Sequence, residues 1–197
     1  MNFPPFSGAP DDYAGAEAVE SCGLDAGPGA VAFRAWVLEE VEGREPGSED
    51  WRAGDWGIVR NCDPTRTTSK HHEGRAWDWH PKSEQTADAL LAALLATDAE
   101  GHPHAAARRA GLRTIIFKSR IWHSGRRRWT PYKGANPHDD HVHFGFSRDG
   151  GAGLTSFYAD AAPGTTATSG GGDLIAVPLF VAAAILAMAA ASMKGKK

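Results

Sequence analysis

Two short histidine-containing motifs, separated by roughly 60 residues, constrain the fold of this chain more than any other feature. Residues 69–78 read SKHHEGRAWD, and residues 137–144 read PHDDHVHF. Gly74 permits a tight turn in the first motif, because glycine accepts backbone angles that other residues avoid. Such a turn folds His71 back over the strand that carries Asp78, so we expect the imidazole and the carboxylate to converge.

The residues around these ligand candidates alternate as expected for strands. Trp77 and Trp79 flank Asp78, which is typical of a strand with one face in a core and the other lining a site. His141 and His143 are two positions apart and therefore point to the same face of a strand. One imidazole can bind a metal ion while the other carries out acid–base chemistry. His72 and His80 are expected at the surface or around the site. For His102, His104 and His123 the sequence names no partner.

Together these residue types predict a mononuclear zinc site. His71, Asp78 and His143 supply three ligands, which leaves one tetrahedral position for water, as in catalytic zinc sites. Zinc lowers the pKa of water towards about 7, and His141 is suited to act as the base at that pH. Glu73, in the turn, is a second candidate for the base. Each residue alone has an ordinary structural alternative, such as a carboxylate bonded to backbone, so the prediction depends on their joint spacing.

The segment between residues 21 and 160 is predicted to be one α+β domain. Hydrophobic periodicity and turn residues predict helices and strands along it. The expected helices span 30–41, 84–97 and 104–110, and the expected strands span 57–60, 75–79, 113–122 and 142–146.

The C-terminal part of the chain predicts a membrane anchor. Residues 174–193 read LIAVPLFVAAAILAMAAASM, without a charge, and a helix of that length spans a bilayer of about 30 Å. Residues 161–173 form a Gly/Ser/Thr linker, and the basic residues 194–197 favour a cytoplasmic C-terminus, with the domain outside the membrane. A buried soluble helix is the alternative. Residues 1–20 form an N-terminal tail without the features of a signal peptide, so the route of the domain across the membrane is open.

The charge and the cysteines limit the remaining possibilities. The net charge is −3, and all acidic residues lie before Leu174, so the body of the chain is acidic. An acidic body does not favour nucleic-acid binding, and the arginine run 126–128 is interpreted as a solvated face. Cys22 and Cys62 belong to no CxxC pair, which argues against a Cys-ligated structural zinc. They are either two buried thiols or one disulfide.

At these motifs the chain resembles zinc peptidases of the LAS superfamily, which includes lysostaphin-type endopeptidases, VanX-like D-Ala-D-Ala carboxypeptidases and Hedgehog proteins. The HxH pair resembles that of lysostaphin and MepA-type endopeptidases, in which the first histidine is catalytic and the second binds zinc. The resemblance thus implies that His141 and His138 are catalytic. The SxHxxGxAxD signature is filled by Ser69, His71, Gly74, Ala76 and Asp78.

The resemblance also implies features outside these motifs. It extends from Ser21 to Phe146 towards actinobacterial and phage hydrolase-like domains, in which the counterparts of Cys22 and Cys62 pair as a disulfide. It implies a Hedgehog/DD-peptidase-like fold, with a small antiparallel sheet and flanking helices. Related carboxypeptidases offer an arginine to substrate near the position of Arg60. Arg60 and Ser69 are therefore the candidates for substrate binding.

The function implied is that of a metallopeptidase with one Zn²⁺ ion, hydrolysing stem or cross-link peptides of peptidoglycan from a membrane anchor. No protein partner follows from the sequence. One alternative is a D,D- or L,D-carboxypeptidase using Asp140, which stands where VanX-like enzymes carry a glutamate. The others are a non-catalytic, zinc-containing wall-binding module and a metal-free structural domain.

Overall fold

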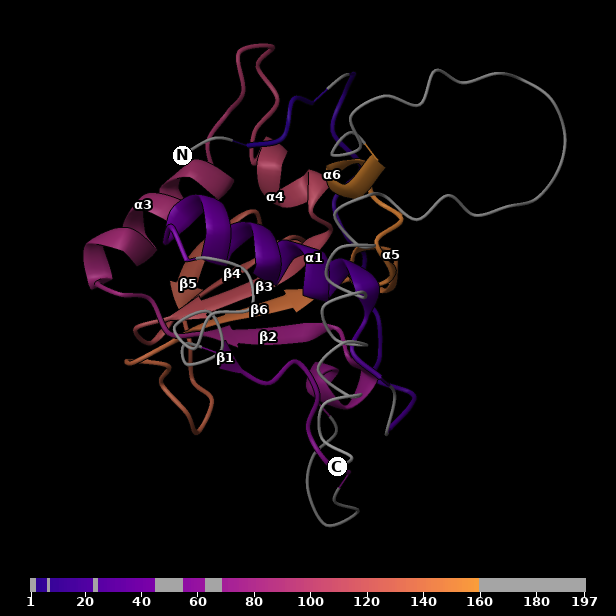
Figure 1. Cartoon of the computed structure of the whole chain (residues 1–197), viewed down its shortest axis with the longest axis vertical. Helices are drawn as coiled ribbons and strands as arrows, with labels where there is room; N and C mark the ends of the chain where they lie inside the picture. The colour runs from indigo at the N-terminus through magenta and orange to yellow at the C-terminus, as the bar shows by residue number, and fades with distance from the viewer. Residues whose placement is uncertain (1–2, 7, 23–24, 45–54, 63–68, 160–197) are drawn as a thin grey trace, which may run out of the picture.

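An antiparallel sheet brings the two motifs together. The computed structural model describes residues 3–6, 8–22, 25–44, 55–62 and 69–159, and within these ranges six strands form one sheet (Figure 1). The strand order is β1-β2-β6-β3-β4-β5, so β6 lies between β2 and β3 although it comes last in the chain. The strands are β1 (Asp55–Trp56), β2 (Ala76–Trp79), β3 (Leu112–Phe117), β4 (Arg120–His123), β5 (Arg128–Pro131) and β6 (Val142–Phe146).

Helices pack on the aromatic face of this sheet. The helix α1 crosses that face (Figure 1), and the ring of its Phe33 lies 5.3 Å from Phe144 and 5.4 Å from Phe146. Trp77 and Trp79 are fully buried in the same core, as their alternation with Asp78 predicts. The helical segments are α1 (Pro28–Trp36), the π-helical turn η1 (Val37–Val41), the 3₁₀ turn η2 (Lys70–Glu73), α3 (Glu84–Leu94), α4 (Ala105–Arg109), α5 (Arg148–Ala152) and α6 (Ser156–Ala159).

The α+β class, the antiparallel sheet and the flanking helices are therefore confirmed, while several element boundaries are wrong. Residues 57–60, which were expected to form a strand, do not form one. They run beside η2, where the Ile58 carbonyl contacts the ring of His71 and Arg60 N donates to the carbonyl of His71. The expected strand 113–122 is a hairpin of β3 and β4. The helix expected over 84–97 ends at Leu94.

The hairpin escaped detection because its turn lacks the usual residues. Lys118 and Ser119 have φ angles of 48° and 57°. A two-residue turn with positive φ at both positions normally contains Asn or Gly. Here the turn is bonded to the second motif: Lys118 N donates to His138 O (2.9 Å) and Ser119 N donates to Pro137 O (2.8 Å). The hairpin tip thus holds the segment that carries His138.

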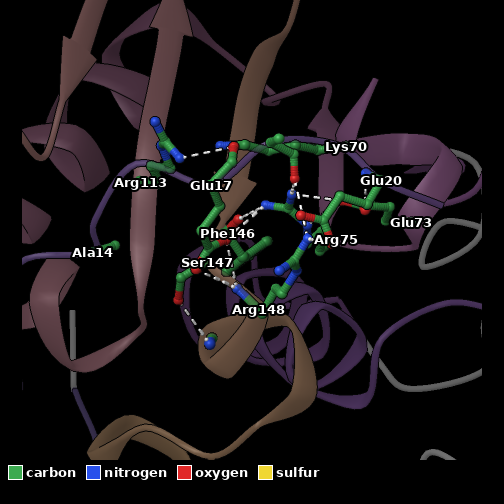
Figure 2. A network of polar contacts seen from close by, with 12 residues as sticks. Ala14, Glu17, Glu20, Lys70, Glu73, Arg75, Arg113, Phe146, Ser147 and Arg148 are labelled. Carbon is green, nitrogen blue, oxygen red and sulfur yellow. Dashed lines mark hydrogen bonds and ion pairs between the residues drawn. The ribbon is translucent and has the colours of Figure 1, made fainter. Parts of the chain in front are cut away.

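An extended N-terminal strap, residues 8–22, is bonded to the sheet and to α5 (Figure 2). The Glu17 carboxylate accepts from Arg75 Nη1 at 3.1 Å and from Arg148 N at 3.0 Å. The segment expected to be an N-terminal tail, residues 1–20, is thus bonded to the domain through Glu17. In this ion pair the Arg75 side chain is buried, with 4% of its surface exposed.

The end of the strap is held by Glu73 and by a disulfide. The Glu73 carboxylate accepts from Glu20 N (2.8 Å) and from Arg75 Nε (2.5 Å). Burial raises the pKa of Glu73, but these hydrogen bonds outweigh it and lower the pKa below its usual range. Glu73 is thus committed to the strap, which argues against its use as a base. A disulfide joins Cys22 to Cys62, with 5.8 Å between their Cα atoms.

The expected linker 161–173, membrane helix 174–193 and basic tail 194–197 lie outside the described residues. Among the residues that are described, no helix combines the length and apolar character needed to cross a bilayer.

Candidate metal centre

The pairing of β2 with β6 places two ligand candidates side by side. Asp78 lies directly opposite His143 in the ladder, on the face of the sheet away from the aromatic core. His143 Nδ1 lies 2.7 Å from Asp78 Oδ1, and only 1% of the Asp78 side chain is exposed. A carboxylate is rarely buried so completely without a charged or metal partner.

The third candidate reaches the same place through the turn η2. Ser69 caps this turn by accepting from His71 N (3.4 Å), and His72 Nδ1 accepts from Ser69 N (3.1 Å). Gly74 ends it in the left-handed conformation. His71 Nδ1 donates to the carbonyl of Ile58 (3.1 Å), which turns Nε2 towards Asp78. Of the two positions expected for His72, the surface and the surroundings of the site, the structure shows the second, because His72 is buried and caps the turn that carries His71. The contacts of Ser69 named above are within the same turn.

Replacing Gly74 with alanine is expected to destabilise the protein by about 2–5 kcal/mol, the sum of left-handed strain and overpacking. Gly74 has a φ of 65°, and an added Cβ would lie 1.9 Å from the Asp25 carbonyl oxygen. Urea unfolding followed by tryptophan fluorescence measures the loss. Gly43→Ala is the matched control, because its φ is 62° with nothing within 4 Å of the Cβ. Equal losses in the two variants would contradict the assigned clash.

The three donor atoms fit a divalent ion such as zinc. His71 Nε2 lies 3.3 Å from Asp78 Oδ1 and 3.3 Å from His143 Nδ1, and the third separation, between Asp78 Oδ1 and His143 Nδ1, is shorter at 2.7 Å. Metal–ligand bonds of about 2.0–2.1 Å in a tetrahedron separate neighbouring donors by about 3.3 Å. Two imidazole nitrogens and one carboxylate oxygen are also a donor set that zinc accepts, and the Ile58 carbonyl orients His71 as a supporting contact does in zinc proteins.

The electrostatics of this cluster favour the protonation states that metal binding needs. Burial raises the pKa of Asp78, but hydrogen bonds from His143 and His71 outweigh it and hold that pKa far below its usual range. Burial lowers the pKa of His143 to about 4, against the opposing effect of Asp78. An ionised carboxylate and a neutral imidazole are the forms that bind metal ions.

Two more histidines lie beside these ligands. His141 Nδ1 donates to Asp140 Oδ1 (2.7 Å), and its Nε2 lies 4.0 Å from Asp78 Oδ2. His138 Nδ1 donates to the Asn136 carbonyl (2.6 Å), and its ring centre is 4.8 Å from that of His141. Burial lowers the pKa of His138, and the neighbouring His141 lowers it further by a smaller effect. The structure thus brings both residues predicted to be catalytic next to the candidate metal ligands.

Arg60 reaches the site, but it contacts a ligand candidate. Its Nη2 lies 2.5 Å from Asp78 Oδ2, and half of its side chain is exposed. Sequence reasoning missed three supporting groups: the Ile58 carbonyl, the Asn136 carbonyl, and Tyr132, whose ring lies 5.4 Å from that of His138. A backbone carbonyl has no side-chain signature, so no pattern points to the first two.

The three histidines for which the sequence names no partner, His102, His104 and His123, have contacts away from the site. His102 Nδ1 lies 3.0 Å from Asp98 Oδ2, and His104 Nδ1 lies 2.9 Å from the Tyr13 hydroxyl. His80 packs nearer the site, with its ring 5.5 Å from that of His141. His123 accepts from Gly125 N (3.0 Å) and so has a local turn contact.

Comparison with protein families gives one match, the VldE C-terminal domain, over residues 43–143. The chain belongs to the VldE C-terminal domain family. The matched residues of this chain include β2, the hairpin of β3 and β4, and five residues of the site: His71, Asp78, His138, His141 and His143. No curated protein and no solved structure matches the chain significantly.

Proposed function

We propose that this chain is a zinc-dependent metallopeptidase that hydrolyses amide bonds in stem or cross-link peptides of peptidoglycan. The observation that carries the proposal is the convergence of His71, Asp78 and His143 on one point, with His141 beside them. The resemblance of both motifs to LAS superfamily peptidases supplies the reaction class, the substrate class and a Hedgehog/DD-peptidase-like fold.

Three protein ligands would leave one tetrahedral position of a zinc ion open to water or substrate. His71, Asp78 and His143 would hold the zinc ion, which would supply Lewis acidity to polarise the amide carbonyl and to lower the pKa of water. His141 accepts a proton from the attacking water through Nε2, because its Nδ1 proton is held by Asp140. His138 lies next to it and is suited to donate a hydrogen bond to the developing oxyanion or a proton to the leaving amine.

The geometry gives less support to a carboxypeptidase that uses Asp140 as its acid–base group. One Asp140 oxygen is bonded to the His141 ring, and 68% of the Asp140 side chain is exposed. This arrangement suits a positioning role for Asp140.

A location outside the cytoplasm belongs to the same proposal. The disulfide Cys22–Cys62 supports an oxidising compartment. Residues 174–193 would then anchor the domain in the membrane next to the cell wall.

Purified sacculi test the proposal directly. We expect the full-length chain, purified in a mild detergent, to release muropeptides, to lose that activity after dialysis against a chelator, and to regain it with one equivalent of Zn²⁺. Mass spectrometry of the products distinguishes cross-link cleavage from removal of a terminal D-alanine. A chain that binds zinc but releases nothing from sacculi of several peptide chemistries would contradict the peptidase and favour a wall-binding module. A metal-free chain would contradict both.

A further inference from the structure

Three imidazoles at the site have the same hydrogen-bonding pattern. In His71, His138 and His141, Nδ1 donates to an oxygen atom, at 3.1, 2.6 and 2.7 Å respectively. The acceptors are two backbone carbonyls and one carboxylate. Histidine ligands of metal ions are held in this way, because the outer N–H bond fixes the tautomer and the ring direction. His138 and His141 are therefore supported as ligands are, although the proposed mononuclear site does not use them as ligands.

The two oxygens of Asp78 have different histidine neighbours. Its Oδ1 lies 3.3 Å from His71 Nε2 and 2.7 Å from His143 Nδ1. Its Oδ2 faces the other side, 4.0 Å from His141 Nε2. One donor atom each from Asp78, His138 and His141 can be chosen so that all lie within 4.8 Å of one another, and all three residues are buried.

We infer that a second divalent transition-metal ion binds beside the first, held by His138, His141 and Oδ2 of Asp78. The carboxylate then bridges two ions, as carboxylates do in two-metal sites with ions about 3.5–4 Å apart. The donors, two imidazoles and one carboxylate, match those of the first site, so zinc or cobalt suits both.

The second ion binds more weakly than the first. The two ions repel each other and share a single carboxylate. The guanidinium of Arg60 is already bonded to Asp78 Oδ2, the oxygen that the second ion requires. Arg60 must therefore swing away, and its half-exposed side chain has solvent on one side into which it can move.

The second ion inhibits the enzyme. This consequence rests on the proposed function, in which His138 and His141 handle protons. An ion bound to their Nε2 atoms occupies the lone pairs that proton transfer needs. Peptide hydrolysis therefore rises with the first equivalent of zinc and falls as the second site fills.

Equilibrium dialysis of the metal-stripped, full-length chain against increasing Zn²⁺, with elemental analysis, tests the inference. We expect two ions per chain in two separate steps. His138→Asn and His141→Asn should each bind one ion with the affinity of the first step. Asparagine is chosen at His138 because the backbone φ there is 57°, which asparagine tolerates. Melting curves establish that the variants are folded.

Three further variants separate this site from general zinc binding. Asp140→Asn should weaken only the second step, by about 10–100-fold, because it removes the charged support of His141. Arg60→Gln should strengthen that step roughly tenfold by removing a competing charge. His102→Asn should change neither step, although His102 lies in a partly exposed cluster with Asp98 and Glu100.

The possible outcomes are distinct. One bound ion with full peptidase activity overturns the second site and leaves the proposed function intact. A second ion that persists in both His138→Asn and His141→Asn also overturns it, because that ion then binds elsewhere. No bound ion at all overturns the second site together with the proposed zinc enzyme.

Discussion

Replacing Asp78 with asparagine is expected to abolish tight zinc binding and peptide hydrolysis together. The substitution hardly changes the size of the side chain, but it removes the only carboxylate among the donors His71, Asp78 and His143. Loss of supporting contacts alone costs about 10–100-fold in metal affinity, so loss of a charged ligand should cost more than about 100-fold. Arg60 loses its anionic partner at the same time and can turn towards solvent.

Metal content after dialysis and muropeptide release from sacculi measure the two effects. Asp98→Asn is the matched control, because the carboxylate of Asp98 is also bonded to a histidine, His102, at 3.0 Å, but outside the site. This control should keep both zinc and activity. An Asp78→Asn protein that still binds one zinc ion tightly and cleaves peptides would remove Asp78 from the ligand set.

Replacing His141 with alanine is expected to lower kcat by about 10²–10⁴-fold while the tightly bound zinc ion stays in place. His141 is 1% exposed, and its ring is oriented by Asp140 so that Nε2 faces the metal cluster. The substitution removes proton transfer without touching His71, Asp78 or His143. The His141→Ala variant should therefore keep its zinc ion and lose turnover, whereas Asp78→Asn should lose both.

Steady-state kinetics on a purified muropeptide, with metal analysis of the same sample, measure this separation. His102→Ala removes an imidazole that belongs to none of the groups around Asp78 and should leave kcat unchanged. Turnover at the wild-type rate in His141→Ala would rule out His141 as the base. Zinc loss in that variant would instead place His141 among the ligands of the first ion.

The two motifs allowed much of the site to be predicted from the sequence. The alternation of Trp77, Asp78 and Trp79 separates a core face from a site face, and the sheet bears this out: the rings of Trp77 and Phe144 stack 5.8 Å apart, while Asp78 and His143 meet on the other side. Such inferences succeed because side-chain direction along a strand follows directly from position. The α+β class could be inferred for a similar reason, since periodicity reflects burial.

Contacts between backbone groups distant in the chain could not be predicted. The hairpin at Lys118 and Ser119 has no turn signature, and its geometry is stabilised by bonds to Pro137 and His138. The support of His71 by the Ile58 carbonyl comes from a segment that was expected to be a strand. In both cases one partner is a main-chain group that every residue possesses.

The sequence by itself determined which side chains can meet around an ion. Residue type specifies the donor atoms, and the two-residue period of a strand specifies the face of the sheet on which each side chain lies. Only the tertiary structure decided what surrounds them: Arg60 on the outer oxygen of Asp78, Asp140 behind His141, and the strap bonded to Glu73. The contacts of Arg60 and of the strap join segments that no local pattern relates, so their formation depends on how the whole chain packs. Periodicity reports the environment of one residue, whereas a long-range hydrogen bond depends on the positions of two.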